Sequence, residues 1–155
     1  YAGLMIKENE PYLIEYNVRM GDPEFQTILP RLKTDFFEII EATINQKLNI
    51  FDINWDTSKT LSIVQCSNGY PENYSNNHEI KNLDKATLTK NEFIFHAGTK
   101  IDGNKVLSNG GRVLNFVAKS ENFKTSREMT INLIKKINWE NGFYRKDIGF
   151  KVIDE

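Results

Sequence analysis

The chain of 155 residues is long enough for about one ordinary domain, and its 39% hydrophobic residues, with 12% aromatic residues, can form a buried core. Its 20 basic and 21 acidic residues nearly balance, which argues against intrinsic disorder and against a general nucleic-acid binder, because neutralising phosphates needs a basic excess. No apolar run approaches the roughly 20 residues that span a bilayer, so we expect neither a nucleic-acid nor a membrane partner.

Two extended runs near the start of the chain, residues 4–7 and 11–17, predict a β-hairpin, because the second has the period-2 pattern of a strand. The Gly-Asp-Pro sequence at 21–23 breaks that strand and predicts a short helix capped by Asp22. Because the chain opens on strand-like residues without an initiator methionine, we expect it to be a C-terminal fragment of a longer protein.

A second helix is predicted from an N-cap at Thr34 to about Leu48, because apolar residues recur there at helical spacing. A polar connection then leads to a strand at 60–67, and residues 73–91 are expected to be loop. The single cysteine, Cys66, lies in this apolar strand, which favours a buried small hydrophobe over a reactive thiol. One cysteine excludes an internal disulfide and is typical of a reducing, cytoplasmic location.

The C-terminal part predicts three strands, at residues 93–96, 105–108 and 112–118. We expect them to pair as a small antiparallel sheet, covered by a helix around 123–137 that buries Leu133, Ile134 and Ile137. Gly110 and Gly111 are expected to form a turn with positive φ. A last strand is predicted at 150–153. The fold class is therefore α+β with mostly antiparallel pairing.

The strongest chemical signal is Glu15-x-Asn17-x-Arg19, because alternate residues of a strand point to the same face, about 7 Å apart. A carboxylate and an amide oxygen suit Mg²⁺, which takes oxygen ligands from protein, phosphates and water. Arginine adds a planar fork for phosphate oxygens. The alternative is an exposed polar strand face whose Glu–Arg pair contributes little.

This E-x-N-x-R strand resembles the metal-binding signature of ATP-grasp ligases. The chain more specifically resembles the phosphoribosylamine–glycine ligases, on the segments YAGLMI at 1–6, IEYNVRMGDPEFQTILPRL at 14–32, FHAGTK at 95–100, GGRVL at 110–114 and FYRKDIG at 143–149. The resemblance covers essentially the whole chain. It implies that residues 1–50 form the end of an ATP-grasp catalytic domain. Residues 51–155 would form the small, mainly antiparallel β C-terminal domain with helical cover.

In this family the glycine carboxylate is phosphorylated by ATP, and 5-phosphoribosylamine attacks the glycyl phosphate to give glycinamide ribonucleotide in purine biosynthesis. The resemblance makes Glu15 and Asn17 ligands of Mg²⁺ or Mn²⁺. Arg19 is expected, from its spacing, to stabilise the transferring phosphoryl group. The nucleotide-binding parts of the family lie upstream, so the partner would be the remainder of the same enzyme, and the isolated chain should be inactive.

Four further residues are candidates for substrate binding: Asp22, His96, Thr99 and Arg112. Asp22 lies beside the expected metal site, but a helix cap explains it equally well. His96 and Thr99 either approach a phosphate or hydrogen-bond inside the small domain. Arg112 either reaches a substrate phosphate or pairs with an acid such as Asp147.

Arg145 has the same ambiguity, because it too could pair with Asp147. Tyr144 and Trp139 are expected to pack rather than to catalyse. Two other functions stay open at this stage: another ATP-grasp enzyme, such as one of the biotin-carboxylase type, or a noncatalytic interaction module that retained the fold. The HAGT and YRKDIG segments count against the first, and the intact E-x-N-x-R pattern counts against the second.

Overall fold

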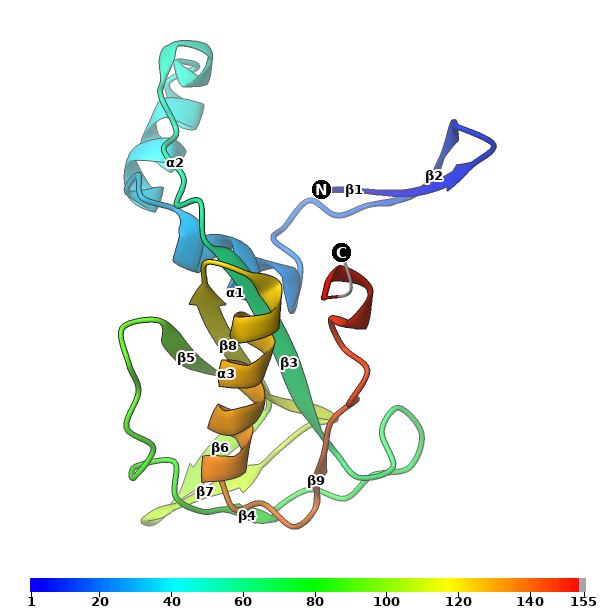
Figure 1. The fold of residues 1–155 in the computed structure, drawn as a ribbon, viewed down its shortest axis with the longest axis vertical. Coiled ribbons are helices and arrows are strands. Elements are labelled where there is room, and N and C mark those ends of the chain that lie inside the picture. Colours follow the sequence, from blue (N-terminus) through cyan, green and yellow to red (C-terminus); the bar gives the residue numbers. More distant parts are fainter. Residues whose placement is uncertain (154–155) are drawn as a thin grey trace.

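A computed structural model describes residues 1–153 of the chain, and its body is a four-stranded antiparallel sheet of order β5-β8-β3-β9 (Figure 1). The strands are β3 (Lys59–Ser67), β5 (Glu92–His96), β8 (Arg112–Ser120) and β9 (Gly142–Phe143). The central strand β8 pairs with β3 from Lys59↔Ser120 to Gln65↔Leu114, and with β5 on its other side. Helix α3 (Phe123–Lys136) lies against one face of this sheet.

The core lies between this sheet and α3, as the helical spacing predicted. Leu133 is fully buried, Ile134 is 4% exposed and Ile137, which caps the end of α3, is 8% exposed. They join Ile63 of β3 and Phe116 of β8 in one hydrophobic cluster. Alternate residues of β3 point the other way, toward α1 (Glu24–Ile28), so both faces of the central strands are covered.

A second sheet contains β4 (Glu79–Ile80), β7 (Lys105–Ser108) and β6 (Thr99–Asp102), in that order. The expected pairing of 105–108 with 112–118 is therefore wrong. β7 pairs with β6, which the sequence did not predict, through a turn in which Gly103 has φ +57°. Local closure of this hairpin competes successfully with the more distant pairing. β4 lies in the stretch that was expected to be loop.

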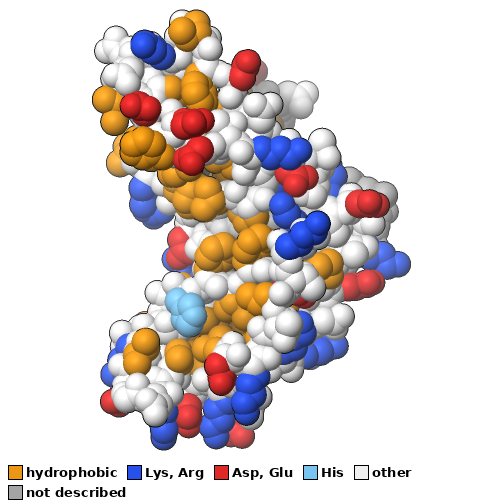
Figure 2. All heavy atoms as spheres, turned by 90° about the vertical axis from the view of Figure 1, so that its left-hand side faces the viewer, with side chains coloured by type: hydrophobic (Ala, Val, Ile, Leu, Met, Phe, Trp, Pro, Cys, Tyr) orange, Lys and Arg blue, Asp and Glu red, His pale blue; other side chains and the backbone are white. Residues whose placement is uncertain are grey.

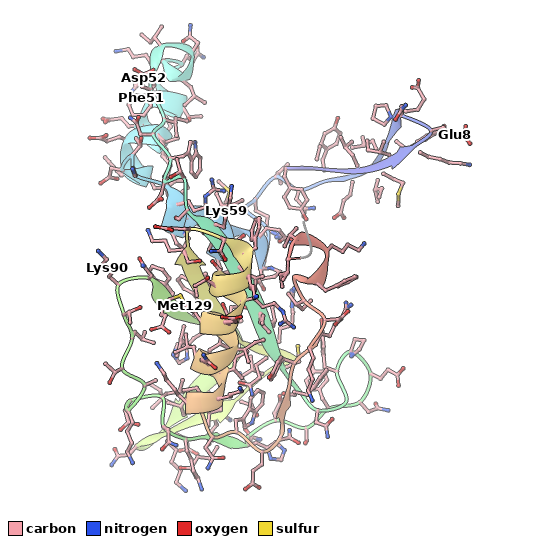
Figure 3. All side chains as sticks on the ribbon, viewed as in Figure 1. Glu8, Phe51, Asp52, Lys59, Lys90 and Met129 are labelled. Carbon is pink, nitrogen blue, oxygen red and sulfur yellow. The ribbon has the colours of Figure 1, made fainter. Side chains whose placement is uncertain are left out.

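The predicted N-terminal hairpin is confirmed as β1 (Ala2–Lys7) and β2 (Glu10–Tyr16). It projects away from the sheet body, with Glu8 at its tip (Figures 1 and 3). Every residue of β2 is exposed, although Tyr12, Leu13 and Ile14 are large and apolar. The hairpin therefore presents apolar side chains on both faces within the described chain.

A second projection consists of α2 (Phe36–Ile44) and the 3₁₀ turn η2 (Leu48–Ile50). The N-cap of α2 is Asp35, whose carboxylate accepts a 2.7 Å hydrogen bond from Phe37 N; the expected cap, Thr34, instead accepts from Asn54 N. The helix also ends earlier than predicted, because Gln46 adopts φ +57°. Figure 2 shows hydrophobic side chains over this projection and over the body below it.

The C-terminal segment corrects a further prediction. Residues 150–153 do not form a strand; Phe150–Val152 is the 3₁₀ helix η3. Gly149 has φ +82°, a left-handed conformation that turns the chain, and Phe150 N donates to Asp147 O. Within residues 1–153, no helix combines the length and apolar character needed to cross a membrane.

Candidate functional site

The expected metal ligands lie together at the end of β2. Asn17 Nδ2 donates a 2.9 Å hydrogen bond to Glu15 Oε1, so the two side chains share one side of the hairpin as the period of a strand predicted. Gly3 pairs opposite Glu15, and a β-carbon there would lie 3.2 Å from Glu15 Cγ. The neighbouring strand thus leaves room for the Glu15 carboxylate, which is exposed to solvent.

Arg19 does not share this strand face, which corrects the expectation. β2 ends at Tyr16, and Arg19 lies in a bend where its Nη1 donates 2.9 Å to Met20 O. Among residues 1–153 it forms no ion pair with Glu15. Its guanidinium is exposed and belongs to the loop that follows the hairpin.

The donor set at Glu15 and Asn17 fits a hard divalent cation. A carboxylate oxygen and an amide oxygen are ligands that Mg²⁺ accepts, and Mg²⁺ takes its remaining ligands from phosphates and water. No group of three or more His, Cys, Asp or Glu side chains in the described part of the chain is arranged to hold a metal. A cation at Glu15 and Asn17 would therefore rely on ligands supplied by a substrate.

Asp22 connects this segment to the sheet and is not a helix cap. The N-cap of α1 is Pro23, and no side chain caps that helix. Asp22 Oδ1 instead accepts from Gln26 Nε2 at 2.8 Å and from Asn115 Nδ2 at 3.4 Å. Arg112 Nη1 donates 2.8 Å to Asp22 O, and its Nη2 lies 3.4 Å from Asp22 Oδ2. Arg112 therefore pairs with Asp22 and not with Asp147.

His96 and Thr99 hydrogen-bond to each other across the end of β5, with Nδ1 and Oγ1 2.8 Å apart. His96 is exposed. Between them Gly98 packs on the backbone of β8, where a β-carbon would lie only 2.6 Å from Arg112 O. The structure thus brings the H-A-G-T segment against the strand that carries Arg112, and it shows the local hydrogen bond.

Gly110 and Gly111 have negative φ, so the predicted positive-φ turn is wrong. Gly111 is required instead for a close approach, because a β-carbon there would lie 2.0 Å from Tyr70 Cδ2. The carbonyls of both glycines accept hydrogen bonds from Ser67, at 2.7 Å for Gly110 and 2.8 Å for Gly111. These contacts fix the turn against the end of β3 and place the Tyr70 ring over it.

Arg145 and Asp147 pair with each other through two hydrogen bonds of 3.1 and 2.6 Å. The pairing raises the pKa of Arg145 and lowers the pKa of Asp147, so both stay charged. Trp139 is 5% exposed in the core, which confirms its packing role, and Tyr144 packs against the same cluster.

A cavity of about 380 Å³ lies on the α1 side of β3, and sequence reasoning did not find it. Its floor is formed by Val64 and by Cys66, which is half-buried as its place in the strand suggested. Burial raises the pKa of the Cys66 thiol, and the positive charge of Arg112 partly opposes that rise. Tyr70 and Tyr144 line the sides. The only sequence signal at this place was the Asn-Gly-Tyr-Pro turn at 68–71.

Comparison with known proteins identifies the family. A model described as "Phosphoribosylglycinamide synthetase, C domain" matches residues 60–151. The phosphoribosylamine–glycine ligase of Caldanaerobacter subterraneus subsp. tengcongensis is 44% identical over 149 residues, which cover 96% of this chain and 35% of that protein. The trifunctional purine biosynthetic protein adenosine-3 of Gallus gallus is 42% identical over 154 residues, which cover 99% of this chain and 15% of that protein.

The fold agrees with this result. The crystal structure of a phosphoribosylamine–glycine ligase from Thermotoga maritima matches with a TM-score of 0.74 and 29% identity, covering 96% of this chain and 36% of that chain. The chain thus spans about a third of the length of the two ligases. It belongs to the phosphoribosylglycinamide synthetase C domain family.

Proposed function

We propose that this chain is the C-terminal third of an ATP-dependent ligase that joins glycine to 5-phosphoribosylamine, giving glycinamide ribonucleotide, ADP and phosphate. The observation that carries the proposal is the Glu15–Asn17 pair, which is tied to the family's C-terminal fold through Asp22 and Arg112. Relatives named phosphoribosylamine–glycine ligase match nearly the whole chain, which supports this activity over a biotin-carboxylase-type enzyme or a noncatalytic module.

The proposal divides the chain near residue 50. Residues 1–50 would complete an ATP-grasp catalytic domain, and residues 51–155 would form the family's C-terminal domain. Two features support this division: the family match begins at residue 60, and the hairpin and α2 project from the sheet body. The exposed apolar side chains of the hairpin support a partner surface in the remainder of the same enzyme, which would supply the ATP-binding parts.

The reaction has two balanced steps. A glycine carboxylate oxygen attacks the γ-phosphorus of ATP, and the bond from that phosphorus to the ADP oxygen breaks. The amine nitrogen of phosphoribosylamine then attacks the glycyl carbonyl carbon, loses a proton and displaces phosphate. A Mg²⁺ or Mn²⁺ ion, when bound, would neutralise the charge on the transferring phosphoryl group.

The residues of this chain take distinct roles in the proposal. Glu15 and Asn17 would hold the metal, for which Asn17 turns its amide oxygen toward the ion. Arg19 is free to donate to phosphoryl oxygens, because its bond to Met20 O is local and exposed. Asp22 orients Arg112, a substrate-phosphate ligand.

His96 and Thr99 extend the same substrate-binding role. Their mutual hydrogen bond holds the imidazole and the hydroxyl at one end of β5, next to the strand that carries Arg112. In this arrangement the hydroxyl of Thr99 and the second ring nitrogen of His96 would both face substrate. The whole proposal is consistent with small-molecule substrates only: ATP, glycine and 5-phosphoribosylamine.

A chimeric enzyme tests the function. These 155 residues replace the corresponding third of the Caldanaerobacter ligase, and ADP formation is measured while ATP, glycine and phosphoribosylamine are varied separately. We expect turnover that requires all three substrates, and none from the isolated chain. Glu15→Gln should lower kcat by roughly 10²–10³-fold and weaken the dependence on Mg²⁺. Glu10→Gln, also exposed on β2, is the matched control and should leave turnover unchanged. A folded chimera without glycine-dependent turnover would refute the function.

A further inference from the structure

The 380 Å³ cavity beside Arg112 has the features of a ligand site, and we propose that it binds a sugar phosphate. The assignment of that ligand as the ribose 5-phosphate part of phosphoribosylamine rests on the proposed function. The cavity is built entirely from residues of this chain: one face of β3, the turn that follows β3, and the segment that follows β9 (Figure 1). Its volume is near the lower end of the ~300–1,000 Å³ typical of small-molecule pockets, which favours a sugar phosphate over a nucleoside triphosphate.

The charge of the cavity selects an anion. Arg112 and Arg145 are the charged side chains among its lining residues, and both are partly exposed, at 42% and 70% of their side-chain surface. Each guanidinium has five N–H donors in a planar fork that matches phosphate oxygens. Arg112 directs Nη1 and Nη2 toward Asp22, and Arg145 directs Nε and Nη2 toward Asp147. Their remaining donors have no partner within residues 1–153.

Both arginines are therefore held on one side by a carboxylate while other N–H groups stay available. Such positioning lowers the entropy lost when a phosphate binds, because the long side chains are already oriented. Arg112 is tied at the backbone as well as at the carboxylate of Asp22. The two partners come from segments far apart in the sequence, 22 and 147, so only the folded chain provides this pair of arginines.

The rest of the lining suits the carbon face of a sugar ring. Tyr70, Pro71, Tyr144 and Phe143 present apolar surface, and Ser62 contributes a hydroxyl whose oxygen is buried without a partner among the described residues. A buried hydroxyl without a partner costs stability unless a ligand or water satisfies it. A ribose hydroxyl would supply that hydrogen bond, which an isolated phosphate would not.

The position of the cavity fits the proposed reaction. Pro23 lines it, and the neighbouring Asp22 holds Arg112. The cavity thus adjoins the loop that leads from the Glu15–Asn17 pair through Arg19. A sugar phosphate anchored at Arg112 and Arg145 would have its anomeric amine free to face this loop.

The test uses the 155-residue chain and its single cysteine, which lines the cavity. N-ethylmaleimide labelling of Cys66 is followed by mass spectrometry at mildly alkaline pH, with ribose 5-phosphate, inorganic phosphate or ATP added at equal concentrations. We expect ribose 5-phosphate to slow labelling several-fold, and isothermal titration calorimetry to give one site per chain. Equal protection by inorganic phosphate or by ATP would overturn the sugar-phosphate assignment.

Variants locate the binding. Arg112→Gln and Arg145→Gln should each weaken ribose 5-phosphate binding by roughly 10- to 100-fold, as expected for loss of a charged hydrogen-bond donor. Lys90→Gln removes an equal charge on the opposite side of the sheet body and should leave binding unchanged (Figure 3). Arg145 is an exposed position, so its variant stays informative if Arg112→Gln unfolds, which melting curves would reveal. Unchanged binding in folded Arg145→Gln would overturn the proposal.

This outcome is separable from the ligase function. Turnover by the chimera without protection of Cys66 would support the ligase and overturn the cavity as its sugar-phosphate site. Protection of Cys66 without turnover by the chimera would support the cavity and refute the ligase.

Discussion

Replacing Gly111 by alanine should destabilise the chain through a steric clash rather than through backbone strain. The φ of Gly111 is negative, so an alanine backbone is accommodated there without the penalty of a left-handed conformation. The added β-carbon, however, would lie 2.0, 2.4 and 3.0 Å from the Cδ2, Cε2 and Cγ atoms of Tyr70. All three distances require the ring to move.

The expected magnitude follows from that displacement. Overpacking typically costs about 1–3 kcal/mol, and the ring of Tyr70 also loses its edge contact with Tyr74, whose centroid lies 5.9 Å away. For a chain of this size such a loss lowers Tm by roughly 2–12 °C, at about 2–4 °C per kcal/mol. Because Tyr70 lines the cavity, Gly111→Ala should also weaken ribose 5-phosphate binding.

The adjacent glycine provides the matched control. A β-carbon at Gly110 would lie 3.4 Å from Gly98 Cα and 3.5 Å from Arg112 O, which is ordinary van der Waals contact. Gly110→Ala should therefore change the free energy of unfolding by no more than about 0.5 kcal/mol. Urea denaturation followed by tyrosine and tryptophan fluorescence measures both variants. Equal unfolding free energies for the two would refute the clash with Tyr70.

Two further predictions concern the core and the pH dependence of stability. Leu133→Ala should cost about 2–5 kcal/mol in urea denaturation, because Leu133 is fully buried, whereas Ile101→Ala at an 80% exposed position should cost little; similar losses would contradict the packing of α3. The pKa of Asp56 is lowered by hydrogen bonds from Ser58 and by Lys119, so its stabilising contribution is present above the unfolded-state pKa and is lost as pH falls toward the folded-state pKa. Asp56→Asn should therefore lower Tm at pH 7 and have less effect in acid, and a loss of the same size across the acid range would argue against this linkage.

The parts of the fold that could be predicted from the sequence depend on local geometry. The hairpin, and the shared side of Glu15 and Asn17, follow from the period of a strand, which links residues two apart. Burial of Leu133 and Ile134 follows from the 3.6-residue period of α3. The family resemblance likewise depended on short segments that are read directly from the sequence, and the family match confirmed it.

Local rules failed where two local solutions compete. Thr34 and Asp35 are both good caps, and the choice was decided by Asn54, whose N–H takes the Thr34 hydroxyl from another part of the chain. The strand expected at 150–153 lost to a turn at Gly149, because glycine adopts positive φ at no steric cost.

The sequence by itself determined the α+β class, the amphipathic helix, the hairpin and the candidate metal pair, because each depends on spacing within a few residues. Only the tertiary structure decided the partner of Arg112 and the cavity beside it. Arg112 and Asp22 are 90 residues apart, and the cavity is closed by segments near residues 23, 66, 70 and 145. Which distant segments meet depends on the packing of the whole sheet and its coverings, and sequence periodicity carries no information about that packing.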